Sequence, residues 1–341
     1  MIRFDCDYLE GAHPAILQRL SETNLEQTLG YSEDPHCEAA REKIRAVCGL
    51  PNAGVHFLVG GTQTNTTVIY ALLRPWEGVI SPVTGHINAH ESGAIEGTGH
   101  KVLVAETHNG KLTAESVEHY YNAWKDDASW EHIVKPGMVY ISHPTETGTL
   151  YTKAELEALS KTCRKLGLPL YLDGARLSYG LASDASDLTL RDIAQLCDIF
   201  YIGGTKVGAL FGEALVIPDP SLIPDIRSLI KQRGGLLAKG RLLGIQFETL
   251  FTDDLYFKMG EHAMRLAMML KEGFAAKGYD FMCDSPTNQQ FPILSLEQVE
   301  RLKQEFSFDD YGPADETHRF ARFCTSWATT EENVRYLLSK I

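Results

Sequence analysis

The chain has 341 residues, of which 44% are apolar and 23% are charged, as in an ordinary globular protein with one large domain and a smaller one. Its formal net charge is −13 and no long basic stretch occurs, which argues against a nucleic-acid partner because phosphate binding needs clustered Lys and Arg. No run of about 18 apolar residues is present, so the sequence predicts no membrane span.

Seven cysteines are scattered along the chain and form no Cys-x-x-Cys pair. This usage is typical of reduced thiols, and it indicates neither a disulfide framework nor a zinc site; no metal ligands are predicted. The N-terminus lacks the apolar core of a secretory signal. We therefore predict a cytoplasmic protein.

Short apolar runs alternate with helical patterns between about residues 34 and 217. Asp34 and Pro35 predict a helix start, and Thr152 with Glu155 predicts a capping box. Several apolar runs have almost no polar position, as is typical of strands buried on both faces. The alternation predicts an α/β fold with a mostly parallel seven-stranded sheet covered by helices. The predicted strands are Val55–Val59, Gly78–Ser81, Lys101–Val104, Met138–Ser142, Leu168–Leu172, Ile199–Ile202 and Ala214–Ile217.

The pattern changes after about residue 245, where shorter strands and helices follow one long helix. We predict a large domain over residues 1–245, with about the first 15 residues as an N-terminal arm, and a small C-terminal α+β domain over residues 246–341. The predicted C-terminal elements are helices at Tyr256–Lys277, Leu296–Phe306 and Thr330–Lys340, and strands at Gln290–Leu296 and Arg319–Thr325.

Three unusual segments each follow a predicted strand. Gly60–Asn65 reads GGTQTN; its glycines allow close approach of a ligand, and free N–H groups at the following helix would face an anion. The alternative is an ordinary glycine turn with a polar cap. Asp173 ends a buried strand and needs a cation or donors; the local alternative is an ion pair with Arg176. Lys206 lies among glycines and apolar residues, where desolvation favours a neutral, nucleophilic amine. Its alternative is a lysine whose amine reaches solvent.

An anion site, a buried acid and a lysine together match the needs of one cofactor, pyridoxal 5′-phosphate (PLP). PLP requires a phosphate anchor, an acid at its ring nitrogen and a lysine for its aldehyde. Asp173 and Lys206 are 33 positions apart, which leaves room for a helix and a strand between them. A nicotinamide enzyme or a non-catalytic binding protein is the competing class, but no G-x-G-x-x-G follows an early strand.

In these motifs the chain resembles the family of threonine aldolases and aromatic amino-acid β-eliminating lyases, which are PLP enzymes of the aspartate-aminotransferase fold. The resemblance covers nearly the whole chain and depends on the order and spacing of several pieces. The matching pieces are Tyr31–Pro35, the GGTQTN loop, His86 through Ala94, Thr145–Tyr151, Asp173–Arg176, Gly204–Lys206, and Arg322 before Thr325.

The resemblance implies roles for individual residues. Lys206 would carry PLP and Asp173 would pair with its ring nitrogen, with His86 against the ring. Arg322 would bind the substrate carboxylate, unless it is a surface arginine at a strand end. Further cofactor-binding candidates are Gly61, Thr62, Gln63, Arg176, Thr205 and Lys239, and further substrate-binding candidates are Arg176, Tyr31 and Asp7.

The group that handles the substrate hydroxyl stays open at this point. Where many threonine aldolases carry a histidine, this chain has Glu146, with His143 three residues earlier. The candidates are His86, His143 and Glu146. His90 is a weaker one, because a histidine on a helix face is more often satisfied by its neighbours.

The resemblance implies cleavage of L-threonine, L-allo-threonine or a related β-hydroxy-α-amino acid to glycine and an aldehyde. β-Elimination and racemisation on the same fold are the alternatives. The resemblance also implies a homodimer or homotetramer in which Tyr31 and Lys239 reach the neighbouring subunit's site. Lys239 could instead be a solvated member of a basic cluster with Lys231, Arg233 and Arg241.

Overall fold

Seven strands form the central sheet of the computed structural model, which describes residues 1–341. Strand β8 runs antiparallel to both of its neighbours, and the other pairs are parallel. The predicted α/β fold with a mostly parallel seven-stranded sheet is therefore confirmed. In spatial order the strands are β2 (Gly54–Leu58), β8 (Glu213–Ile217), β7 (Ile199–Gly203), β6 (Leu170–Asp173), β5 (Lys135–Ser142), β3 (Glu77–Pro82) and β4 (Lys101–Ala105).

Alternate residues of each strand enter two separate apolar clusters, one on either face of the sheet. In β7, Phe200 and Ile202 belong to one cluster, and Ile199 and Tyr201 to the other. This two-sided burial explains the nearly continuous apolar sequence of the strands. The first face is covered by α2 (Pro35–Cys48), α5 (Ala114–Lys125), α6 (Lys153–Leu166), α7 (Leu177–Leu181), α8 (Leu190–Leu196) and α10 (Arg241–Leu250), and the other by α3 (Gly61–Leu72), α4 (His86–Ala89) and α9 (Ile226–Gln232).

The predicted helix starts are confirmed at α2 and α6. The Asp34 side chain accepts a hydrogen bond from the backbone N–H of Cys37, one turn into α2. Thr152 and Glu155 form the reciprocal capping box at the start of α6. Each helix thus begins where a polar side chain satisfies backbone N–H groups that have no partner within the helix.

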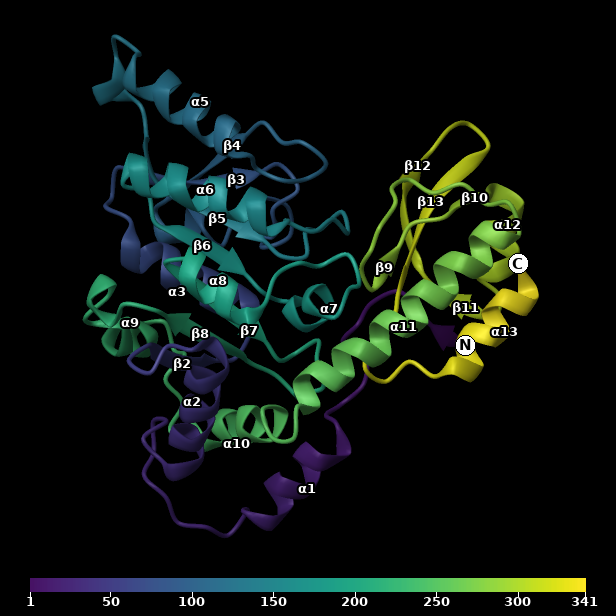
Figure 1. The fold of residues 1–341 in the computed structure, drawn as a ribbon, viewed down its shortest axis with the longest axis horizontal. Helices are drawn as coiled ribbons and strands as arrows, with labels where there is room; N and C mark the ends of the chain where they lie inside the picture. The colour runs from purple at the N-terminus through teal and green to yellow at the C-terminus, as the bar shows by residue number, and fades with distance from the viewer.

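A long helix, α11 (Leu255–Ala276), crosses Figure 1 diagonally from the sheet to a smaller C-terminal unit. A third apolar cluster, which includes Leu270 and Phe323, forms the core of this unit. Its other elements are β9 (Gln289–Gln290), β10 (Ile293–Ser295), α12 (Leu296–Leu302), β11 (Phe306–Ser307), β12 (Asp309–Pro313), β13 (His318–Cys324) and α13 (Glu331–Lys340).

Two predictions for this unit are wrong in detail. The strand predicted at Gln290–Leu296 is broken into β9 and β10, because Pro292 has no N–H to donate to a neighbouring strand. The helix predicted at Leu296–Phe306 ends at Leu302, and Phe306 begins β11 instead.

The N-terminal residues connect the C-terminal unit to the sheet. Strand β1 (Ile2–Arg3) pairs with β11, and Phe4 packs in the C-terminal cluster. The chain then passes to the loop after β7, where the N–H of His13 donates to the Gly208 carbonyl at 2.8 Å, and continues into α1 (Pro14–Glu22). In Figure 1 the N-terminus accordingly lies beside the C-terminal elements. The domain division predicted near residue 245 stays a prediction.

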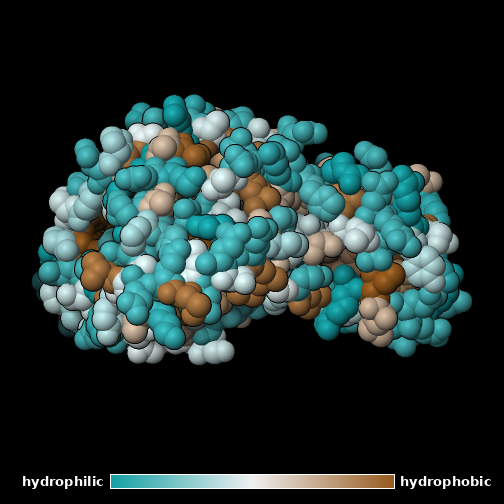
Figure 2. All heavy atoms as spheres, turned by 90° about the horizontal axis from the view of Figure 1, so that it is seen from below, coloured by the Kyte–Doolittle hydropathy of each residue, from teal (hydrophilic) through white to brown (hydrophobic).

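The molecular surface is mainly hydrophilic on the face that Figure 2 draws. Figure 2 shows apolar side chains on one face as separate patches, with a larger and a smaller body joined by a narrower region. No helix of the structure combines the length and the apolar character needed to cross a bilayer.

Candidate active site

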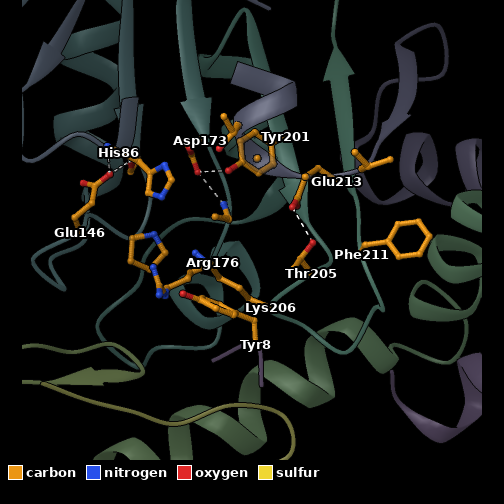
Figure 3. Close-up of a pocket in the computed structure, with 17 residues that line it drawn as sticks. Tyr8, His86, Glu146, Asp173, Arg176, Tyr201, Thr205, Lys206, Phe211 and Glu213 are labelled. Carbon is orange, nitrogen blue, oxygen red and sulfur yellow. Dashed lines mark hydrogen bonds between the residues drawn. The ribbon is translucent and has the colours of Figure 1, made fainter. Parts of the chain in front are cut away.

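A cavity of about 310 Å³ opens at the edge of the sheet where β5, β6 and β7 end. Ligands of open parallel sheets gather at this edge. Figure 3 shows side chains from the N-terminal arm, from the loops that follow β3, β5, β6 and β7, and from the start of β8 converging on the cavity. Its lining includes Tyr8, Gly60, Gly61, Thr62, His86, Ser142, Pro144, Glu146, Asp173, Arg176, Tyr201, Thr205, Lys206, Phe211 and Glu213.

Lys206 lies in the loop after β7, and its side chain reaches the cavity. Its Nζ forms no hydrogen bond or ion pair, and lies 5.9 Å from the centre of the Tyr8 ring. Burial, followed by the positive charge of Arg176, lowers the pKa of Lys206. The amine is therefore biased toward the neutral, nucleophilic form, as the sequence predicted.

Asp173, the last residue of β6, is buried and receives four hydrogen bonds. The hydroxyls of Tyr201 and Tyr140 donate at 2.5 and 2.7 Å, and the Asn65 amide donates at 3.2 Å. The backbone N–H of Ala175 adds a bond of 3.0 Å. These four donors satisfy the carboxyl group at the cavity wall, and no cationic side chain is bonded to it.

Helix α3 begins at the cavity without a side-chain cap at Gly60. The backbone N–H groups of Gly61, Thr62 and Gln63 donate to no protein acceptor. Such free N–H groups at the positive end of a helix dipole can bind an anion. A Cβ atom at Gly61 would lie 3.0 Å from the Tyr201 hydroxyl, so glycine keeps this wall open.

The side chain of Gln63 turns away from the cavity. Its oxygen accepts from the Val59 N–H and its nitrogen donates to the Arg233 carbonyl. Only the Gln63 backbone is thus available to a ligand at the start of α3.

Glu146 and His86 lie together on one wall of the cavity. One Glu146 oxygen accepts from the His86 backbone N–H at 2.8 Å and from the Ser142 hydroxyl at 2.6 Å. Its other oxygen is buried and has no partner. Burial raises the pKa of Glu146. Burial would lower the pKa of His86, but a 2.7 Å hydrogen bond to Glu91 and the charge of Asp173 raise it overall.

Arg176 lines the cavity and is held by the N-terminal arm. Asp7 accepts from its Nε at 2.6 Å and from its Nη2 at 3.0 Å, and also from the Asn288 amide. The alternative of an Asp173–Arg176 ion pair is therefore not what the structure shows. Burial would raise the pKa of Asp7, but Arg176 and Lys206 lower it overall.

Arg322, on β13, does not line the cavity in this structure. Its guanidinium donates to Asp309 on the paired strand β12 and to the Gln289 oxygen, and its Nε is buried without a partner. Thr205 lines the cavity, where its hydroxyl donates to Glu213.

Four other candidates lie away from the cavity. His143 is buried, with its Nδ1 facing the Tyr151 N–H, and burial lowers its pKa to about 4. His90 is exposed beyond His86. Tyr31 and Lys239 lie in neighbouring exposed segments, where the Tyr31 N–H donates to the Ala238 carbonyl.

Two features of the site were missed in the sequence. In the sequence, Tyr140 and Tyr201 look like ordinary members of apolar strands. Because side chains alternate along a strand, both face the same side of the sheet as Asp173 on β6, and this alternation is the one feature that could have predicted their contact with it. Glu213 was missed because it reaches the cavity only if β8 runs antiparallel to β7, and the sequence does not show the direction of that strand.

Comparison with known proteins shows the family. The model of the family described as "Beta-eliminating lyase" matches residues 5–294. A low specificity L-threonine aldolase of Pseudomonas aeruginosa is 32% identical, over 99% of this chain and 96% of that protein. A second protein of that name, from a Pseudomonas species, is 30% identical over the same shares.

Solved structures agree with this. A threonine aldolase of Leishmania major has a TM-score of 0.96 and 46% identity, covering 99% of this chain and 98% of that one. An aspartate aminotransferase of Thermus thermophilus, at 17% identity and a TM-score of 0.71 over 100% of this chain and 90% of that one, shows the fold alone and confirms the predicted fold type. On these matches, the chain belongs to the beta-eliminating lyase family.

Proposed function

We propose that the protein is a PLP-dependent lyase that cleaves L-threonine, L-allo-threonine or a related β-hydroxy-α-amino acid to glycine and an aldehyde. The observation that carries the proposal is one cavity that holds an unpaired lysine amine, a buried carboxylate and the uncapped start of a helix. The names of the similar proteins support the substrate class.

The cavity residues fit PLP. Lys206 would hold the aldehyde carbon, the free N–H groups at the start of α3 would hold the phosphate, and Asp173 would hold the proton on the ring nitrogen. When bound, PLP supplies an electron-accepting ring that stabilises negative charge at the substrate Cα. The volume of about 310 Å³ is at the small end for a cofactor site.

Arg176 is the guanidinium that faces the cavity, and Asp7 holds it by two of its three nitrogens. The remaining Nη1 would bind the substrate carboxylate, and the fixed geometry would orient the bond to be broken. Arg322 remains a second candidate for this role, but it would have to exchange Asp309 for the substrate.

Glu146 is the proposed base for the substrate hydroxyl. Glu146 lines the cavity and has one buried oxygen without a partner, whereas His143 lies away from the cavity and His86 is assigned to the cofactor ring. A raised pKa makes a carboxylate a stronger proton acceptor. The oxygen would take the hydroxyl proton as the Cα–Cβ bond breaks, the aldehyde would leave, and Cα would take up one proton to give glycine. His86, fixed by Glu91, would pack against the cofactor ring.

The test separates hydroxyl deprotonation from the rest of the reaction. Glu146→Gln should lower threonine cleavage by at least about 10²-fold. It should keep the exchange of the glycine α-hydrogen in D₂O, which needs no hydroxyl base. The exposed His90→Gln is the matched control and should keep both activities. Loss of both activities in folded Glu146→Gln would contradict the assignment, and a wild-type protein that releases no aldehyde would refute the proposed function.

β-Elimination and racemisation are not favoured, because the reported relatives that are at least 30% identical to this chain are named threonine aldolases. Assays for ammonia with a keto acid, and for loss of optical activity, distinguish these reactions from aldehyde release.

We also propose a cytoplasmic homodimer or homotetramer. Seven free cysteines suit a reducing compartment. Leu25 and Leu29, in the segment before α2, are 91% and 69% exposed and adjoin exposed Tyr31, as an apolar contact surface between subunits would be. Lys239 would then reach the neighbouring site. Light scattering, with Leu25→Glu as the disrupting variant, tests the assembly.

A further inference from the structure

Glu213 is a buried carboxyl group of the cavity that the proposed reaction does not use. It begins β8, pairs with Gly203 at the end of β7, and is 4% exposed. Because β8 runs antiparallel to β7, its first residue lies at the edge where the parallel strands end. That direction brings the carboxyl to the cavity and to the Lys206 loop (Figure 3).

Both Glu213 oxygens bind the two residues that precede Lys206. One accepts from the Thr205 hydroxyl at 3.0 Å and the other from the Gly204 N–H at 3.2 Å. The loop closes on itself as well, since the Gly212 carbonyl accepts from the N–H groups of Gly204 and Thr205, and the Gly212 N–H donates to the Thr205 oxygen. The base of the lysine side chain is thus fixed by a carboxyl group.

Glu213 and Lys206 also influence each other's charge. Burial raises the pKa of Glu213 to about 8, although the Thr205 hydrogen bond and Lys206 oppose the rise. The other charged groups that act on Lys206 are Arg176 at the start of α7, Asp7 on the arm and Asp173 on β6. The hydroxyls of Tyr171, Tyr201 and Tyr256 are the further titratable groups that Glu213 influences.

We propose that Glu213 is a positioning residue for the Lys206 amine: its two oxygens fix the loop that carries the lysine, and its carboxyl group, where ionised, favours the protonated amine in the same cavity. The role of this amine in the reaction rests on the proposed function, but the contact itself does not. Glu213 thus has two separable effects: its hydrogen bonds fix the geometry of the loop, and the ionisation of its carboxyl group changes the charge near the Lys206 amine.

The test measures Lys206 directly, in the full-length protein freed of PLP. Reductive methylation with formaldehyde, quantified on the Lys206 peptide across pH 6–11, gives the midpoint of its titration. Glu213→Gln should lower this midpoint by up to about one pH unit, so that Lys206 labels up to about tenfold faster at pH 9, where the wild-type Glu213 carboxyl is ionised. Glu77→Gln is the matched control, because Glu77 is also a buried glutamate that begins a strand, and it should leave the midpoint unchanged.

An unchanged midpoint in folded Glu213→Gln, or an equal shift in Glu77→Gln, would overturn the proposal. If Glu213→Gln does not fold, Thr205→Val gives the second test: it removes one hydrogen bond and keeps the carboxyl, so the midpoint should stay and PLP should bind more slowly. Unchanged PLP binding in Thr205→Val would refute the positioning role. If the midpoint shifts in Glu213→Gln but the wild-type protein binds no PLP, the proposed function alone is refuted.

Discussion

Glu77 and Glu213 are both buried glutamates at the first position of a strand, yet they lie at opposite edges of the sheet. Glu77 begins the parallel strand β3, away from the cavity, and its carboxylate accepts from Lys135 at 2.9 Å. Glu213 begins the antiparallel strand β8 and so faces the cavity. Strand direction, more than residue type or burial, separates a structural ion pair from a group of the candidate active site.

The two carboxyl groups also differ in charge. Burial would raise the pKa of Glu77, but the Arg74 N–H and Lys135 lower it overall. Glu213 has no such cation bonded to it, and burial raises its pKa to about 8. Glu77 is therefore a satisfied charge, whereas Glu213 is a carboxyl group that can change protonation near neutral pH.

The largest expected effect on activity comes from replacing the lysine that lies at the same edge of the sheet as each glutamate. Lys206→Ala should abolish the visible absorbance of bound PLP and lower threonine cleavage by at least about 10³-fold. Lys135→Ala, at the other edge, should keep both and cost the fold about 1 kcal/mol, because Lys135 is partly exposed. Absorbance spectra and an aldehyde assay check both variants, and a coloured, active Lys206→Ala protein would contradict the comparison.

The two edges should differ next in their aspartates. Asp173→Asn removes the acid at the proposed ring nitrogen, and turnover should fall by about 10²-fold. Asp198 precedes β7 at the opposite edge, where it accepts from the Leu170 N–H at 2.8 Å. Asp198→Asn should therefore change stability and leave kcat close to wild type. Equal losses of kcat in the two variants would show that the edge of the sheet at which an aspartate lies does not determine whether it contributes to catalysis.

A smaller effect is expected in the pH dependence of stability. The raised pKa of Glu213 means that the folded state binds a proton more tightly than the unfolded state, so this group destabilises the fold as pH rises from about 4.5 to about 8. The lowered pKa of Glu77 acts in the opposite sense: its stabilisation is present above about 4.5 and is lost as pH falls through the folded value. Urea denaturation at pH 3, 5 and 9 should show that Glu213→Gln flattens the decline between pH 5 and pH 9, and that Glu77→Gln destabilises by similar amounts at pH 5 and pH 9 and by less at pH 3. Parallel curves for both variants and wild type would contradict the assignment.

The smallest effect concerns the donors to Asp173. Tyr140→Phe removes one of four hydrogen bonds and should lower turnover about tenfold. Tyr171 donates to Asn65, one contact further away, and Tyr171→Phe should lower turnover less than about threefold. A larger loss in Tyr171→Phe would mean that Asn65, and not the tyrosine hydroxyls, controls the carboxylate.

Much of the fold follows from local pattern. The strands could be predicted because burial on both faces leaves nearly continuous apolar runs, and the starts of α2 and α6 could be predicted because capping is local. The strand predicted through Pro292 was wrong because a proline, which has no N–H to donate, separates β9 from β10, and each then pairs with a different part of β13.

The candidate site divides in the same way. Asp173 and Lys206 could be predicted because each is an unusual polar residue after an apolar strand. The partner of Arg176 could not, since Asp7 is 169 positions away and a nearer carboxylate was available. Glu213 required the antiparallel direction of β8, which no local pattern encodes.

The most direct test of the account is to identify the residue that holds PLP. The purified protein is loaded with PLP, reduced with borohydride and digested, and the modified peptide is sequenced by mass spectrometry. The account predicts one phosphopyridoxyl group on Lys206 and none on Lys135 or Lys239. Modification of another lysine, or no modification at saturating PLP, would contradict it.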